Sequence, residues 1–279
     1  MSGTLASVAA RDGVLLCTRR WVPGGDAWAR LLLIHGIAEH SGRYERTGTL
    51  FAAGGVEVSA FDLRGFGGSG GRRAFVRRWD EYLDDVEDRL AALREGLPLV
   101  LMGHSMGGLI ALTYVTSGRP APDLLVLSSP ALGTSVPGPV RALAALTSRV
   151  LPTVAIPNAL RGEQLSSDPV VGRAYFADPL VVPRSTTRLG AELFAAAQRG
   201  RRDLARLRVP TLVIHGSADT IVPPASTEPL GTLPNVQRRV YRRPASRDPQ
   251  RASGTAGRGR HPRLASRADG SPGIAAPRA

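Results

Sequence analysis

The chain has 279 residues, of which 43% are hydrophobic and 21% charged, and it carries a net charge of +13. Its length fits one large domain, or a domain with an insertion, and is enough to bury a sizeable core. A small disulfide-stapled scaffold is excluded, because Cys17 has no second cysteine to pair with. No apolar run approaches the roughly 20 residues that a membrane-spanning helix needs.

The positive charge is unevenly distributed along the chain. All 36 basic residues are arginine, and nine of them lie in residues 242–279, where Asp248 and Asp269 are the acids. About half of the net charge therefore lies in this tail, where solvated arginines explain it, and we expect no nucleic-acid partner. Met1–Asp12 has no basic cluster ahead of a long apolar stretch, so we expect no secretory signal and a cytoplasmic location.

Seven apolar runs predict strands, with helical patterns between them. Several runs are almost continuously apolar, which is typical of strands covered on both faces of a parallel sheet. The clearest helix repeats apolar residues at the helical period from Trp79 to Leu93. This alternation predicts an α/β domain of three layers. The expected strands are Val14–Trp21, Leu31–His35, Val56–Asp62, Leu99–Gly103, Leu124–Ser128, Thr211–His215 and Val236–Tyr241.

The alternation is interrupted twice. Between residues 131 and 187, prolines separate short apolar helical pieces such as Val140–Leu151, which predicts an insertion between a first core part, 1–130, and a second, 188–241. In residues 242–279, Leu264 and Ile274 are the only larger aliphatic residues. Such a segment cannot bury enough apolar surface to offset the entropy lost on ordering, so we expect it to be disordered.

A nucleophile elbow is predicted at residues 103–107, which read Gly103-His104-Ser105-Met106-Gly107. In this motif a tight turn between a buried strand and a helix projects the serine hydroxyl above the sheet, and small glycines allow the close backbone approach. An apolar strand pattern precedes Ser105 and a helical pattern follows it. A second match at residues 67–71, around Ser69, is followed by arginines instead of an apolar helix, so we predict Ser105 as the nucleophile.

An acidic partner for this serine is expected at the end of a later strand. Asp219 follows the strand predicted at Thr211–His215 and is a candidate to orient a histidine. The alternative is that Asp219 only forms or caps a turn.

At this point the sequence resembles the monoacylglycerol lipases and related lysophospholipase-like serine hydrolases of the α/β-hydrolase fold. The resemblance covers residues 10–241 and implies a mostly parallel central sheet flanked by helices, with a small helical cap insertion. It rests on the following segments: His35–Tyr44, Asp62–Gly70, Gly103–Gly108, Asp168-Pro169, Asp178–Val181 and Gly216–Pro223.

The resemblance also implies roles for particular residues. The backbone N–H groups of Ile37 and Met106 would form the oxyanion hole, and the insertion would be a mobile apolar cap that guides an acyl chain to Ser105. Ala38 departs from the glycine that the family shows there, which puts the geometry of this loop in question. No cofactor and no metal ion is implied, and a transient contact of the cap with lipid is expected.

The histidine that should complete the triad does not appear where this fold places it. In chain order it follows the acid, yet four of the five histidines precede Asp219. Only His261 follows it, within the tail that we expect to be disordered, and its neighbours Arg260 and Pro262 do not resemble the family's histidine-glutamate turn. We therefore do not assign His261 to the triad.

A shift of reading frame explains both the missing base and the unusual tail. Codons for Arg242–Ala252 can be chosen so that reading one nucleotide later gives Ala-Gly-Leu-Arg-His-Glu-Ile-Leu-Asn-Glu-Pro, which resembles the family's histidine turn. Shifted reading of GC-rich codons also favours Arg, Pro, Ala and Gly. We hypothesise one extra nucleotide after the codon for Tyr241.

Two functions are consistent with these observations. The first is a serine ester hydrolase that acts on monoacylglycerols, lysophospholipids or similar small acyl esters, impaired here by loss of its histidine. The second is an inactive hydrolase-fold protein that binds an acyl ligand or a partner through the cap. The acyl-chain length, the head group and the oligomeric state are not specified by the sequence.

Overall fold

The computed structural model describes residues 3–133, 136–158, 160–165 and 169–242, which all fall within one compact unit, Met1–Arg243. Residues 243–279 lie outside the described part, and with them His261 and all of the predicted tail except Arg242. The predictions made for that segment are therefore not tested by the structure.

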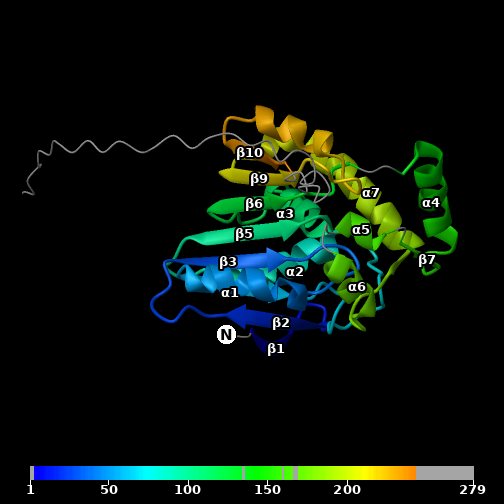
Figure 1. Cartoon of the computed structure of the whole chain (residues 1–279). Coiled ribbons are helices and arrows are strands. Elements are labelled where there is room, and N and C mark those ends of the chain that lie inside the picture. The colour runs from blue at the N-terminus through cyan, green and yellow to red at the C-terminus, as the bar shows by residue number, and fades with distance from the viewer. Residues whose placement is uncertain (1–2, 134–135, 159, 166–168, 243–279) are drawn as a thin grey trace, which may run out of the picture. The chain divides into compact units, whose positions relative to one another are not determined.

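Eight strands of the described residues form one sheet, in the order β1-β2-β4-β3-β5-β6-β9-β10 (Figure 1). The strand β2 pairs antiparallel with β1 and β4, and every other neighbouring pair is parallel. The strands are β1 (Thr4–Ala9), β2 (Leu15–Trp21), β3 (Ala29–Ile34), β4 (Val56–Phe61), β5 (Leu99–His104), β6 (Leu124–Ser128), β9 (Thr211–Gly216) and β10 (Val236–Tyr241). The mostly parallel α/β sheet expected from the sequence is confirmed.

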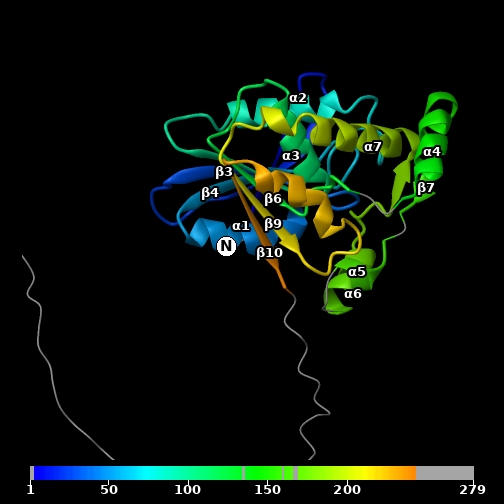
Figure 2. The same cartoon turned by 90° about the horizontal axis from the view of Figure 1, so that it is seen from above.

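Helices lie on both faces of this sheet (Figure 2). On one side lies α1 (Glu45–Ala53), and on the other lie α2 (Asp80–Ala91), α3 (Met106–Thr116) and α7 (Thr187–Arg202). The described residues also form three 3₁₀ helices: η1 (Ser41–Tyr44), η2 (Leu204–Arg206) and η3 (Pro224–Thr232). The arrangement is the three-layer architecture that the alternating pattern predicts.

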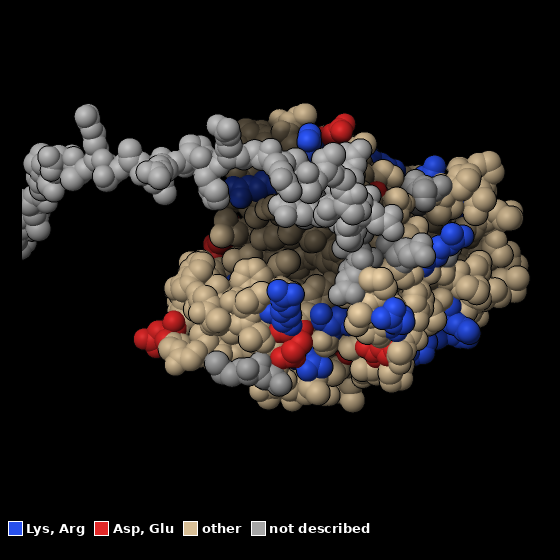
Figure 3. All heavy atoms as spheres, viewed as in Figure 1, with Lys and Arg blue, Asp and Glu red and all other residues tan. Residues whose placement is uncertain are grey.

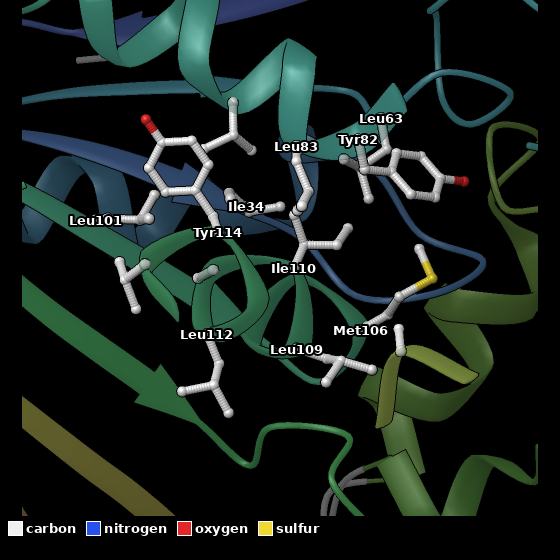
Figure 4. Packing of buried hydrophobic residues seen from close by; sticks show 14 of the residues in the cluster. Ile34, Leu63, Tyr82, Leu83, Leu101, Met106, Leu109, Ile110, Leu112 and Tyr114 are labelled. Atoms are coloured by element: carbon white, nitrogen blue, oxygen red, sulfur yellow. The ribbon is translucent and has the colours of Figure 1, made fainter. Parts of the chain in front are cut away.

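The helix α3 lies at the centre of the core and holds the turn at Ser105, where the candidate site begins, in place. All of its residues are buried, and Leu109, Ile110 and Leu112 pack with side chains from the sheet and from α2 (Figure 4). The side chain of Met106, the first residue of α3, is fully buried in the same cluster. Because this helix is anchored on all sides, the turn that precedes it at Ser105 is held rigidly.

One face of the central strands is covered less completely than the other. Along β5 and β9, Leu101 and Val213 are fully buried on the α3 side, whereas the alternating residues Met102 and Ile214 are only half-buried. Among the described helices, α3 packs on β5 and β6, and α1 packs on β2 and β4. Figure 3, drawn from the α1 side, shows this face hollowed above α1. We call the half-buried side of β5, β6 and β9 the open sheet face.

The segment predicted as an insertion contains short elements outside the main sheet. The helix α4 packs against α7, and β7 pairs antiparallel with β8 in a separate small sheet. The elements are α4 (Gly138–Val150), β7 (Ala155–Pro157), α5 (Gly162–Leu165), α6 (Pro169–Ala177) and β8 (Arg184–Thr186). The boundaries 131 and 187 of a cap domain stay a prediction.

Candidate active site

Ser105 occupies a strained turn between β5 and α3. Its backbone angles are φ 49° and ψ −115°, in the left-handed half of the map that costs about 1–3 kcal/mol for a residue with a side chain. The turn is held by hydrogen bonds from Ser105 N to Ser128 O and from Ala131 N to Ser105 O, of 2.9 and 3.0 Å. This is the strand-turn-helix geometry that the elbow motif predicts.

The glycines on either side of Ser105 are required by close backbone packing. A Cβ atom on Gly103 would lie 2.2 Å from the carbonyl oxygen of Gly107. A Cβ atom on Gly107 would lie 2.3 Å from the carbonyl oxygen of Ile34. Both contacts are to backbone that cannot move aside, so the turn tolerates no larger residue at either position.

Two cavities meet at Ser105. The larger, of about 400 Å³, is lined by His104, Ser105, Asp219 and Tyr241, among others. The smaller, of about 110 Å³, is lined mainly by apolar residues: Ile37, Met106, Ala131, Gly133, Leu193, Phe194, Ala197, Ile221 and Val222, together with Ser105. A larger cavity of mixed polar and apolar lining and a small, mainly apolar one meet at one hydroxyl, which suits a substrate with a polar part and an aliphatic part.

The two N–H groups predicted for the oxyanion hole are free to bind a ligand. Ile37 and Met106 both line the small cavity beside Ser105. In the described part of the chain, neither backbone N–H donates a hydrogen bond. Unpaired N–H groups next to a nucleophile are the arrangement that stabilises a developing oxyanion.

Asp219 lies at the carboxyl end of β9 and lines the large cavity with Ser105. Its Oδ1 accepts hydrogen bonds from the N–H groups of Ile221 and Val222, both at 2.9 Å, so the turn-forming role weighed above is present. Its Oδ2 lies 3.4 Å from Nε2 of His215. Burial opposes the charged form, but the contacts with His215 and the two N–H groups lower the pKa of Asp219 below its ordinary value. The group is therefore a carboxylate at neutral pH.

No described histidine is placed to deprotonate Ser105. The hydroxyl of Ser105 makes no hydrogen bond within the described residues, and each of the four histidine rings contacts scaffold atoms instead. The contacts are the Gly36 carbonyl and the Leu63 N–H for His35, Asp178 for His40, the Ser128 hydroxyl for His104, and the Val222 carbonyl for His215. Burial lowers the pKa of His35, which keeps that ring neutral.

Ala38 adopts the conformation that a glycine would favour. Its φ is 69°, so the chain follows a left-handed path here even with a methyl group present. The carbonyl oxygen of Ala38 accepts a hydrogen bond from the N–H of Val182, at 2.9 Å, and its methyl group is buried with Tyr175 and Val181. The loop that carries Ile37 is thereby fastened to the segment after α6.

The comparison with known families decides which fold family this is. Residues 25–254 match the family described as serine aminopeptidase, S33. The chain belongs to this family. Members are hydrolases, and the chain is by family an enzyme of the lipase and esterase type.

Relatives of known name agree with the family. The chain is 34% identical over 230 residues to a monoacylglycerol lipase of Mycolicibacterium smegmatis, covering 79% of this chain and 81% of that one. It is 34% identical over 222 residues to human monoglyceride lipase, covering 75% and 71%. The crystal structure of a Paleococcus ferrophilus monoacylglycerol lipase superposes with a TM-score of 0.75 at 30% identity, over 81% of this chain and 88% of that one.

The structure adds site residues that the sequence did not reveal. Glu39 accepts hydrogen bonds from the Gly36 N–H, at 2.6 Å, and the Tyr44 hydroxyl, at 2.7 Å, and so braces the loop that carries Ile37. From α7, Leu193 and Phe194 reach the small cavity. These two residues are consecutive in the sequence, and no local pattern signals that the helix that carries them lies beside Ser105.

Two further findings concern membrane spans and metal sites. No helix in the described part of the chain is long and apolar enough to cross a membrane. Within the same residues, no group of three or more His, Cys, Asp and Glu side chains is arranged to hold a metal ion.

Proposed function

We propose that this protein is a serine hydrolase that cleaves monoacylglycerols, lysophospholipids or similar small acyl esters through an acyl-enzyme intermediate. The observation that carries this proposal is the position of Ser105, on a strained turn where a large cavity shared with Asp219 meets a small apolar one. The names of the relatives support an acyl ester of glycerol as the substrate.

The residues of the site take distinct roles in this reaction. Ser105 Oγ attacks the ester carbonyl carbon and its proton passes to an imidazole, which returns it to the leaving alcohol. The N–H groups of Ile37 and Met106 stabilise the oxyanion, while the acyl chain enters the small cavity. Asp219, charged at neutral pH, orients the imidazole. Water then attacks the acyl-enzyme, Ser105 recovers its proton, and the fatty acid is released.

We further propose that this chain is impaired because its imidazole was lost to a shift of reading frame. The strand β10 ends at Tyr241, whose carbonyl oxygen accepts a hydrogen bond from the N–H of Ser217, two residues before Asp219. Tyr241 and Arg242 line the cavity that holds Ser105 and Asp219. The shifted frame provides a histidine five residues after Tyr241. The segment that carries this histidine would begin at the wall of the cavity that holds Ser105 and Asp219.

The test compares hydrolysis of a 1-monoacylglycerol by this chain and by a version with one nucleotide removed after the Tyr241 codon. We expect turnover by the restored chain, and a kcat at least about 10⁴-fold lower for the chain as it stands, because a triad acts as a unit. Ser105→Ala in the restored chain should fall to the same level. This control assigns the activity to Ser105 and not to a contaminant.

Each other outcome has a definite meaning. Equal activity of the two chains would reject the lost base, and His261→Ala would then be the first variant to make. If neither chain turns over any acyl ester, while both bind a non-hydrolysable acyl ether of glycerol, the alternative of an inactive acyl-binding protein is correct.

The cap segment is also proposed to contact lipid transiently. Along α4, Val140, Leu143, Leu146 and Val150 lie on one side of the helix and are 53, 64, 60 and 75% exposed. A helix with an exposed apolar face and arginines elsewhere is the form that lies in a membrane interface. Such contact would bring an acyl ester from its lipid surface to the cavities at Ser105.

A further inference from the structure

A groove of about 360 Å³ lies at the antiparallel end of the sheet. Its walls come from β1, β2 and β4 and from the last turn of α2 with the residues that follow it. Among the described residues it shares none of its lining with the two cavities at Ser105. It is therefore a separate site, to which the reaction proposed above assigns no role.

Strand register places one polar row and one largely apolar row on the face that lines this groove. Thr4 pairs with Arg20, and Arg20 pairs with Ser59, so these three side chains share a face. In the next row Thr18 pairs with Phe61. Phe61 and Leu32 of β3 are buried beneath the groove, and the apolar floor that a ligand would meet is formed by the accessible residues Val22, Ala92 and Leu93.

The hydroxyl groups along this groove are available to a ligand. Within the described part of the chain, the side chains of Thr4, Thr18 and Ser59 make no hydrogen bond. Each hydroxyl both donates and accepts, so together they suit a polar group that lies above an apolar floor.

Arg89, near the end of α2, carries a positive charge that interacts electrostatically with neighbouring Asp88 but is held by no hydrogen bond or salt bridge in the described chain. It lines the groove, makes no hydrogen bond or ion pair there, and its Nε is buried without a partner. The adjacent carboxylate of Asp88 is bound by Arg11, at 2.6 and 3.2 Å. Arg20, by contrast, is paired with Glu57 at 2.7 Å. The guanidinium of Arg89 therefore keeps donors that an anion in the groove could engage.

We propose that this groove binds a small amphiphilic carboxylate. Its aliphatic chain lies over Val22, Ala92 and Leu93, and its carboxylate accepts hydrogen bonds from the guanidinium of Arg89. The hydroxyls of Thr4 and Ser59 complete the polar side. A free phosphate shares the anionic chemistry but has no chain to cover the apolar floor. The proposal is independent of the function proposed for Ser105, since the two sites share no residue.

The test is calorimetric titration of the full-length chain with octanoate, inorganic phosphate and octan-1-ol. We expect octanoate to bind at least tenfold more tightly than either of the others, because only octanoate has both charge and chain. Arg89→Gln should weaken octanoate binding at least tenfold. Arg94→Gln is the matched control, since Arg94 follows the same helix but contacts the carbonyls of Pro120 and Ala121 and does not line the groove.

A second variant removes the space and leaves the charge. Ala6 lies on the exposed rim of the groove, so Ala6→Trp should fill it and abolish octanoate binding without disturbing the core. Octanoate binding that survives both Arg89→Gln and Ala6→Trp would place the ligand elsewhere and overturn the proposal. Phosphate binding as tight as octanoate binding would overturn it too, because it would show a plain anion site.

Discussion

At the scale of single residues, the backbone angles of Ser105 predict how replacing it by glycine or by alanine changes the free energy of unfolding. Replacing alanine by glycine normally destabilises a protein by about 0.4–1 kcal/mol through the entropy of the unfolded chain. At φ 49° and ψ −115°, however, a Cβ atom carries strain of about 1–3 kcal/mol, which glycine relieves. We therefore expect Ser105→Gly to be at least as stable as Ser105→Ala in urea unfolding.

Ser128 provides the matched control for this comparison. It ends the regular strand β6 and has no positive φ, so there the usual order should hold, with Ser128→Ala more stable than Ser128→Gly. If glycine is the less stable replacement at both positions by the same margin, the turn at Ser105 is not strained.

The sequence predicted those site residues whose signal lies in one contiguous stretch of the chain. The elbow at Ser105 could be located because its strand, glycines and helix are contiguous. The buried contact of Ala38 with Tyr175 joins segments far apart in the chain, and no local pattern predicts it. The bracing of the Ile37 loop by Glu39 is local, but it depends on side-chain directions that hydropathy does not show. The catalytic roles of Ser105, Asp219, Ile37 and Met106 stay predictions until they are measured.

At the scale of elements, the seven expected strands are all confirmed, and three others that the described residues contain were missed. Buried parallel strands are continuous apolar runs, so hydropathy alone finds them. The strand β1 is an antiparallel edge strand with five of its six residues exposed, so it has no apolar run. The strands β7 and β8 have three residues each, too few to show an alternation. Exposure and length, not unusual chemistry, explain these omissions.

The exposed face of α4 leads to a prediction about membranes. If this helix contacts lipid, replacing Leu143 and Val150 together by aspartate should reduce co-sedimentation with phosphatidylcholine vesicles several-fold, because each substitution puts a charge into the apolar interface. Leu50→Asp on α1 is the control, since Leu50 is equally exposed, at 63%, but lies outside the segment 131–187. An equal loss with Leu50→Asp would show nonspecific adhesion and reject the contact.

At the scale of the whole molecule, the reading-frame hypothesis makes a prediction about the open sheet face. The half-buried side of β5, β6 and β9 is apolar, and the tail that follows β10 in this frame offers few aliphatic side chains to cover it. Apolar surface left in water forfeits about 25 cal/mol per Å². A chain in this state should be poorly soluble, as exposed sheet faces promote association.

Substitutions at two neighbouring residues of β5 test whether the open sheet face is uncovered. Leu101 is fully buried beneath α3, so Leu101→Glu should unfold the protein, because an unpaired carboxylate in the core costs several kcal/mol. Met102 lies on the open sheet face, only partly buried against the cluster on the α1 side, so Met102→Glu should cost clearly less than Leu101→Glu in urea unfolding and should improve solubility. In the chain with one nucleotide removed after the Tyr241 codon, the same Met102→Glu should become markedly destabilising, provided that the restored segment covers this face. Equal damage from Met102→Glu in both chains would mean that the face is already covered in this frame, and the structural half of the frame-shift hypothesis would fail.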